Sequence, residues 1–169
     1  MPMIRQRTLA LPALALLLTA AAAGLYTPPP GSAERSAIVK VLHHGDDRPE
    51  ARFTFRTFKV FHQGQRALAY VQGSGEVGDF EALLEQKGAD RWRKVWGVSD
   101  GGSDSCEAGA RHYAWAVRLI QGYGLAPDTL IPGITGLSRD LARQAKTEPE
   151  LQCVGDLDGG PDGPDDPDA

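Results

Sequence analysis

Hydrophobic residues recur with a helical period in two stretches of the chain. Residues 33–43 follow Ser32, a typical N-cap residue, and place their aliphatic side chains on one helical face. Residues 107–123 show the same period, and a shorter helix is expected near residues 138–146. The sequence therefore predicts one helix before, and two helices after, a central segment.

The central segment favours strands, because aromatic and β-branched residues there alternate with polar ones. We expect three strands, at residues 51–63, 66–72 and 91–98. In the first of these, the alternation of the Phe side chains changes parity between Phe55 and Phe58. This change predicts a β-bulge near residues 56–57.

Residues 79–87 fit either a helix or a strand. Leu83 and Leu84, with Glu and Gln side chains around them, favour a helix by propensity. A strand would instead place Phe80, Ala82 and Leu84 on one face. The choice decides how the glycines directly before this segment are interpreted.

The segment Gly73-x-Gly75-x-x-Gly78 has the spacing of a dinucleotide-binding fingerprint, and Asp100 falls where a ribose-binding acid would stand. That function needs a helix directly after the glycines, since its N-terminal N–H groups hold the pyrophosphate. A helix of only nine residues would be short for the crossover, and Tyr70 lies in a polar first strand. Nucleotide binding is the less favoured interpretation, and we expect no cofactor.

The N-terminus has the composition of an export signal. Residues 1–23 carry Arg5 and Arg7, then an apolar run that ends in Ala21-Ala22-Ala23. A basic head, an apolar stretch and small residues at the exit are the three parts of a secretory signal peptide. We expect export to the periplasm or the extracellular space, with an inner-membrane anchor at residues 8–26 as the alternative.

Composition divides the rest of the chain into three parts. Residues 24–31 predict a Pro-rich linker, residues 32–153 a single domain, and residues 154–169 a disordered acidic tail. Six of the 22 acidic residues follow Val154 and two of the 18 basic residues precede Gly24, which leaves 16 of each sign between them. A neutral domain argues against a nucleic-acid partner, which would require neutralisation of phosphates.

Several short stretches carry a resemblance to a class of proteins. They are Glu34-Arg35-Ser36-Ala37-Ile38, Phe58-Lys59-Val60, Ala67-Leu68-Ala69-Tyr70-Val71-Gln72, Phe80-Glu81-Ala82-Leu83-Leu84 and Asp90-Arg91-Trp92-Arg93-Lys94-Val95. In their order, about residues 32–101 resemble small uncharacterised exported bacterial proteins, whose plan is similar to the NTF2-like and cystatin-like folds. The resemblance implies that residues 79–87 form a strand paired with residues 91–98, and it implies no catalytic residues.

These observations together predict an α+β fold. We expect an N-terminal helix packed on a curled four-stranded antiparallel sheet, followed by a C-terminal helical extension and the disordered acidic tail. Cys106 and Cys153 are the only cysteines, and an exported chain favours a disulfide between them over free thiols or a redox pair. In the chain-entropy model, such a bond contributes about 4 kcal/mol to stability.

Aromatic residues give the candidate ligand site. Trp92 and Trp96 lie four residues apart on one parity of their strand, and Trp115 lies on the second helix. The favoured interpretation is a core between sheet and helix, because large rings dominate core burial. The alternative is a concave pocket lined by Tyr70, Trp92, Trp96 and Trp115.

The histidines decide between binding and catalysis. His43 and His44 at a helix end favour capping, and we expect no metal site there. His62 is the only His on the predicted sheet, so a His62 that faced a pocket beside an acid would favour an enzyme. No nucleophile motif is present, and we name no catalytic residue.

The expected function is an exported, non-enzymatic module that binds a small molecule or another envelope protein. An enzyme that uses an NTF2-like pocket is the alternative, and a nucleotide binder is the less favoured third. We expect contact with a membrane only through the N-terminal segment, if that segment is not cleaved.

Overall fold

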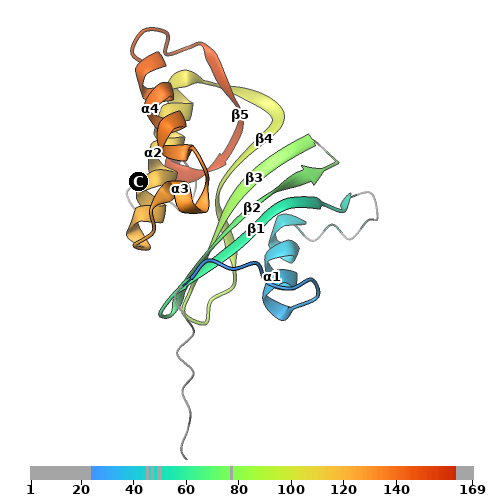
Figure 1. Ribbon diagram of the computed structural model, residues 1–169. Coiled ribbons are helices and arrows are strands. Elements are labelled where there is room, and N and C mark those ends of the chain that lie inside the picture. The colour runs from blue at the N-terminus through green and yellow to red at the C-terminus, as the bar shows by residue number, and fades with distance from the viewer. Residues whose placement is uncertain (1–23, 45, 47, 49–50, 77, 163–169) are drawn as a thin grey trace, which may run out of the picture.

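The computed structural model describes residues 24–162, except residues 45, 47, 49–50 and 77 (Figure 1). The predicted signal peptide and residues 163–169 of the predicted tail lie outside the described residues. The described elements are, in chain order, α1 (Ala33–Leu42), β1 (Thr54–Gln63), β2 (Arg66–Gly75), β3 (Gly78–Lys87), β4 (Arg93–Ser105), α2 (Cys106–Gly122), α3 (Pro127–Leu130), α4 (Ile134–Gln144), β5 (Gln152–Gly159) and the 3₁₀-helix η2 (Gly160–Asp162). Among the described helices, none has the length and apolar character needed to span a membrane.

The strands form one open antiparallel sheet in the order β1-β2-β3-β4-β5. Each strand therefore pairs with its neighbour along the chain, and α2, α3 and α4 stand between the last two strands in sequence. The α+β class is confirmed. The expected number of four strands is wrong, because the described sheet has five.

The fifth strand corrects the prediction of an acidic tail from residue 154. β5 covers Gln152–Gly159 and pairs with β4, with Val98 opposite Leu157 and Ser99 opposite Asp156. Asp and Gly composition predicted disorder here, but β4 supplies a long edge whose hydrogen-bonding groups β5 satisfies. Asp156 and Asp158 therefore belong to the fold.

Two local predictions in the first three strands are confirmed. The register of β1 against β2 shifts between Phe55 and Thr57, at the predicted bulge. The bulge brings Phe55 and Phe58 to the same face, with ring centroids 5.4 Å apart. Residues 79–87 form a strand, as the resemblance implied, despite their helical propensity.

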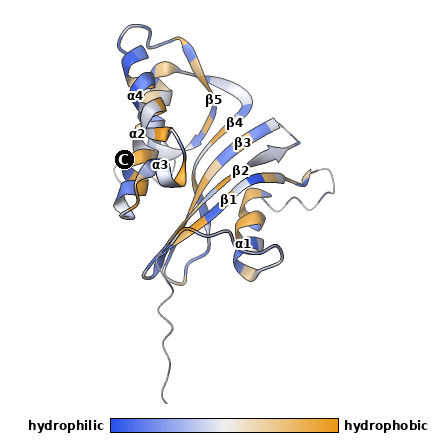
Figure 2. Ribbon diagram, in the orientation of Figure 1, coloured by the Kyte–Doolittle hydropathy of each residue, from blue (hydrophilic) through white to orange (hydrophobic). Residues whose placement is uncertain are grey.

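The helix α1 covers one face of the sheet. Ser32 caps it by accepting a hydrogen bond from Arg35 N at 3.3 Å. Ile38 and Leu42 pack into a cluster with apolar residues of β1, β2 and β3 and with Trp92. Figure 2 shows apolar residues concentrated on α1 and along these strands.

The helices α2, α3 and α4 cover the opposite face. Fully buried side chains there include Leu68, Leu83, Trp96, Ile120 and Tyr123. Cys106 at the start of α2 and Cys153 on β5 lie at disulfide distance, with Cα atoms 4.8 Å apart, which confirms the predicted pairing. The bond fastens the C-terminal strand to the first turn of α2.

An irregularity in β4 separates the two tryptophans that the sequence placed on one face. Leu83 pairs with Trp96 but Leu84 pairs with Lys94, so Val95 is an extra residue in β4. As a result, Trp92 packs in the α1-side cluster, whereas Trp96 packs in the α2-side cluster. The expectation that both rings share one face is wrong for this reason.

Candidate binding groove

The sheet is hollowed on the α1 side, beside the C-terminal end of that helix. Across the middle of the sheet, Ala82 of β3 pairs with Gly97 of β4, which pairs with Asp158 of β5. Two small residues side by side leave a depression where larger side chains would fill the space. The depression has a volume of about 220 Å³.

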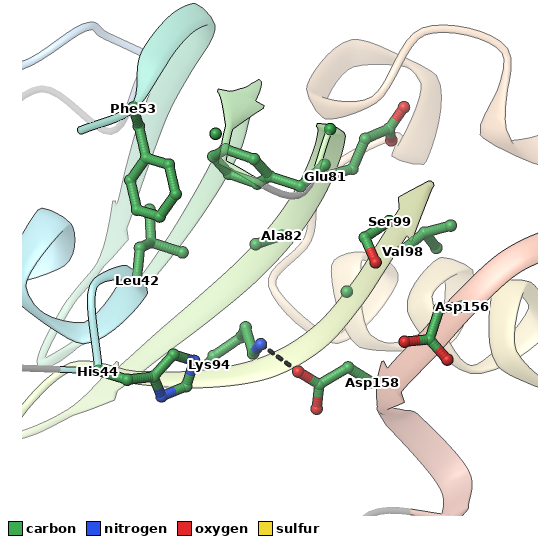
Figure 3. A pocket seen from close by; sticks show the side chains of 14 residues that line it. Leu42, His44, Phe53, Glu81, Ala82, Lys94, Val98, Ser99, Asp156 and Asp158 are labelled. Carbon is green, nitrogen blue, oxygen red and sulfur yellow. Dashed lines mark hydrogen bonds and ion pairs between the residues drawn. The ribbon is translucent and has the colours of Figure 1, made fainter. Parts of the chain in front are cut away.

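Gly97 has no side chain and therefore leaves the bottom of this depression, its floor, open. A Cβ at that position would lie 3.3 Å from the carbonyl oxygen of Glu81 and 3.8 Å from both Lys94 Cδ and Asp158 Cβ. Any side chain there would therefore enter the depression. Glu81 itself turns its carboxylate away from the floor, as Figure 3 shows.

The walls of the groove differ in chemistry. Leu42 and Phe53 stand on one side and Asp156 and Asp158 on the other (Figure 3). The ring of Phe53 also packs against that of Phe80, with centroids 4.8 Å apart. The site therefore combines an aromatic wall with an acidic rim.

The acidic rim is only partly neutralised. Lys94 forms an ion pair with Asp158 across the groove. Asp156 is exposed and makes no ion pair within the described part of the chain. Asp156 therefore presents a solvated negative charge beside an apolar wall.

His44 borders the same site and has a strained backbone conformation. It follows the C-cap residue His43 and has a φ of 48°, a left-handed conformation that glycine adopts more easily. For a residue with a Cβ, this conformation costs about 1 kcal/mol. Its imidazole lines the groove (Figure 3), and strain of this kind is characteristic of functional sites.

A second hollow adjoins the first. It has a volume of about 330 Å³ and shares His44, Lys94 and Asp158 with the groove. Trp92 and Trp115 line it, so the structure brings together two of the four aromatic residues predicted for a pocket. The two hollows form an elongated site with aromatic rings at both ends and the Lys94–Asp158 pair between them.

The other two predicted residues lie elsewhere. Trp96 is fully buried beneath α2 and donates a hydrogen bond from Nε1 to the carbonyl oxygen of His112 at 3.2 Å. Tyr70 lies on the α2 side of the sheet, where its hydroxyl donates to Glu81 Oε2 at 3.0 Å. The four residues therefore do not line one cavity.

Tyr70 belongs to a cavity of about 320 Å³ between the sheet and residues 131–137. Gln72 donates to the other oxygen of Glu81 at 3.3 Å and accepts from Thr57. Burial, with Glu81 nearby, raises the pKa of Tyr70, and burial raises that of Tyr113 to about 12. Both phenols are neutral at physiological pH, and hydrogen bonds join Tyr70, Gln72 and Thr57 to one another through Glu81 and Gln72.

His62 lies beside an acid but outside these cavities. Its Nε2 is 2.7 Å from Glu34 Oε1, and Tyr26 contacts both side chains. His62 lines none of the cavities named above. The arrangement fastens the N-terminal segment and α1 to β1.

The glycine fingerprint has a different role in the fold. Gly73 and Gly75 lie in β2, and Gly78 begins β3, so a hairpin takes the place of a strand followed by a helix. The pyrophosphate-binding helix N-terminus of the fingerprint is therefore missing at this position. Gly75 and Gly78 instead border the groove.

Two further features bear on chemistry. Within residues 24–162, apart from the gaps named above, no three His, Cys, Asp or Glu side chains gather closely enough to share a metal ion.

His112, which sequence reasoning left without a role, is buried and stacks on Trp96, with Nε2 2.9 Å from the carbonyl oxygen of Gly97.

Comparison with protein-family models, with curated proteins and with solved structures found no match to this chain. The resemblance of residues 32–101 to small exported proteins therefore stays a prediction.

Sequence reasoning missed the residues that shape the groove. Asp156 and Asp158 were assigned to a tail, and His44 to a helix end. Two signals in the sequence could have indicated them. Asp156 and Asp158 alternate as residues on one strand face do, and Gly97 interrupts the large residues of the predicted strand 91–98.

Proposed function

We propose that the protein is an exported binding module whose groove holds a short extended segment of an envelope protein. The observation that carries this proposal is the small-residue floor of Ala82 and Gly97, which opens an elongated site on an otherwise well-packed sheet. The burial of Trp96 supports a protein partner over a ligand enclosed between sheet and helix.

The chemistry of the groove favours a particular kind of segment. Aromatic rings at both ends, Phe53 with Phe80 and Trp92 with Trp115, suit apolar side chains of the partner. Across the groove from Phe53, the exposed carboxylate of Asp156 suits a Lys or Arg side chain of the partner. The expected ligand is an extended peptide in which a basic residue stands between apolar ones.

Binding accounts for the arrangement more simply than catalysis does. His44 and Asp158 both border the groove, but Asp158 is paired with Lys94 and no hydrogen bond joins it to His44 among the described residues. In His-based catalytic sites the imidazole is commonly oriented by a hydrogen bond to a third group. The geometry therefore supports recognition by shape and charge.

Two synthetic peptides test the proposal. One is acetyl-Ala-Phe-Lys-Ala-Phe-amide, and the other carries Glu in place of Lys. Each is titrated into the full chain while tryptophan fluorescence is followed, since Trp92 and Trp115 border the second hollow. We expect saturable binding of the Lys peptide and about tenfold weaker binding of the Glu peptide, because the rim is acidic.

A pair of variants locates the binding. Asp156→Lys reverses the charge of the rim and should weaken the Lys peptide about tenfold. Glu148→Lys makes the same change at an exposed position between α4 and β5 and should leave the affinity unchanged. Equal affinity for both peptides, or no effect of Asp156→Lys, contradicts the proposal. Saturation by NAD in the same assay would favour the nucleotide-binding alternative instead.

A further inference from the structure

Basic side chains gather at one end of the sheet. This basic end consists of the turn between β1 and β2 and the turn between β3 and β4. Its charged residues are the cations Arg66, Lys87, Arg91 and Arg93 and the anions Glu85 and Asp90. Positive charges therefore outnumber negative ones there.

The cations at the basic end converge on a single buried carboxylate. Glu85 lies 3.1 Å from Lys87 Nζ, 3.5 Å from Arg66 Nη2 and 3.4 Å from Arg93 Nη2. It also accepts a hydrogen bond from the Tyr123 hydroxyl at 2.7 Å. The side chains of Arg66 and Lys87 nevertheless remain 41% and 51% exposed.

The opposite end of the sheet has the reverse charge. Around the turn between β2 and β3 and the described residues that lead into β1, four acids face three bases; these residues are Asp46, Glu76, Asp79, Asp100, Arg48, Arg52 and Arg56. Arg56 pairs with Asp79, and Arg48 pairs with Asp46 and Glu76. The described domain is therefore electrically polarised along its strands.

The chain enters the fold at the basic end. Tyr26 forms an antiparallel bridge with Val60, so the residues before it run along β1 toward Gln63. Gly24, the first described residue, therefore lies near the turn that leads to Arg66. In the sequence, the apolar run predicted to enter a membrane during export directly precedes Gly24.

We propose that the basic end rests on a bilayer surface that contains anionic lipids. A surface of negative headgroups attracts exposed Lys and Arg side chains within about 10 Å at physiological salt. The acidic end then points away from the membrane. The inference rests on predicted export and is independent of what the groove binds.

Vesicle binding of the full chain provides the test. Partition is measured on vesicles of phosphatidylcholine alone and of phosphatidylcholine with phosphatidylglycerol, and the ratio of the two is compared between variants. The double variant Lys87→Gln with Arg91→Gln should lower this ratio about tenfold or more, since each base strengthens binding about five-fold. The control is Arg139→Gln with Arg143→Gln on exposed positions of α4, and it should keep the ratio of the wild type.

Hydrogen exchange on vesicle-bound protein gives a second readout that does not depend on how tightly residues 1–23 hold the chain. The turns at residues 63–66 and 87–92 should be protected on phosphatidylglycerol vesicles and not on phosphatidylcholine alone. A separate titration compares inorganic phosphate with chloride at equal ionic strength. Equal release by both salts fits a charged surface, whereas release by phosphate alone indicates a discrete anion site. Three outcomes overturn the proposal. They are release by phosphate alone, an unchanged partition ratio in the Lys87/Arg91 variant, and a lack of protection of these two turns.

Discussion

The two faces of the sheet differ in the size of the side chains at their centres. On the α2 side, large residues such as Leu83, Trp96 and Tyr123 are fully buried beneath the helices. On the α1 side, a helix of 10 residues covers part of the sheet, and beyond it the floor is built from Ala82 and Gly97. Both faces carry a buried apolar cluster, and the α1 side also has the depression that we propose holds a partner.

The difference concentrates stability and recognition in different residues. A fully buried ring contributes through burial and close contacts, so its loss leaves a cavity. A groove residue keeps much of its surface in water, so its loss changes binding more than folding. Substitutions on the two faces should therefore separate the two properties.

The largest effect on stability is expected for Trp96→Ala. It removes a fully buried ring and the hydrogen bond to the carbonyl oxygen of His112, and should lower the free energy of unfolding by about 3–5 kcal/mol. Denaturant unfolding measures the change. Ser99→Ala, on the groove face, should shift it by less than about 0.5 kcal/mol. Equal losses in both variants would contradict the contrast between the faces.

Loss of the disulfide should have the next largest effect. Replacing Cys106 and Cys153 with Ala opens a loop with a sequence separation of 47 and should cost about 4 kcal/mol in the chain-entropy model. Hydrogen exchange should accelerate in β5 and α2 before it does in α1 and β1. Uniform acceleration in all four elements would show that the bond does not fasten the C-terminal strand specifically.

Glu85 on the α2 side gives a pH-dependent contribution. Burial raises the pKa of Glu85, but the hydrogen bond from Tyr123 and the neighbouring cations outweigh burial and bring it below its ordinary value of 4.5. The charged form therefore stabilises the folded state above pH 4.5, and this stability is lost as the pH falls through the lowered pKa.

Glu85→Gln should remove that contribution. We expect a loss of about 1–3 kcal/mol at neutral pH and a flatter dependence of unfolding free energy on pH in the acid range. Glu148→Gln, at an exposed position, is the control and should retain the wild-type profile. If the unfolding free energy of Glu85→Gln depended on acid pH in the same way as that of the wild type, Glu85 would not be the source of this contribution.

His44→Gly should have the smallest effect on stability and the opposite sign. Glycine relieves the left-handed conformation at this position, so the free energy of unfolding should rise by about 1 kcal/mol. Affinity for the Lys peptide should fall about five-fold if the imidazole contacts the ligand, which corresponds to one hydrogen bond. Thermal unfolding and fluorescence titration measure the two changes, and a more stable variant with full affinity would remove His44 from the site.

Local sequence patterns predicted much of the fold. Ser32 marked the start of α1, and the parity change between Phe55 and Phe58 located the bulge in β1, because both signals depend on near neighbours. The extra residue Val95 in β4 was not predictable in this way. Its bulge exists only in relation to β3, and it decides which face receives Trp96.

The groove was harder to predict than the fold. Asp156 and Asp158 reach it only because β5 pairs with a strand more than fifty residues earlier in the chain. Composition alone placed them in a disordered tail, since no local signal reports a distant pairing edge. Tyr70 and Trp96 were grouped with Trp92 and Trp115 as large aromatic residues, but strand register turns Tyr70 and Trp96 to the α2 side of the sheet and Trp92 to the α1 side.

Chemical-shift mapping of the full chain during titration with the Lys peptide shows which face of the sheet binds the peptide. We expect the backbone signals of Ala82, Gly97 and Ser99 to shift saturably, and those of Tyr70 and Tyr113 on the opposite face to stay unchanged. Shifts confined to the Tyr70 cavity, or no saturable shift at any of these residues, would contradict a binding groove on the α1 side of the sheet.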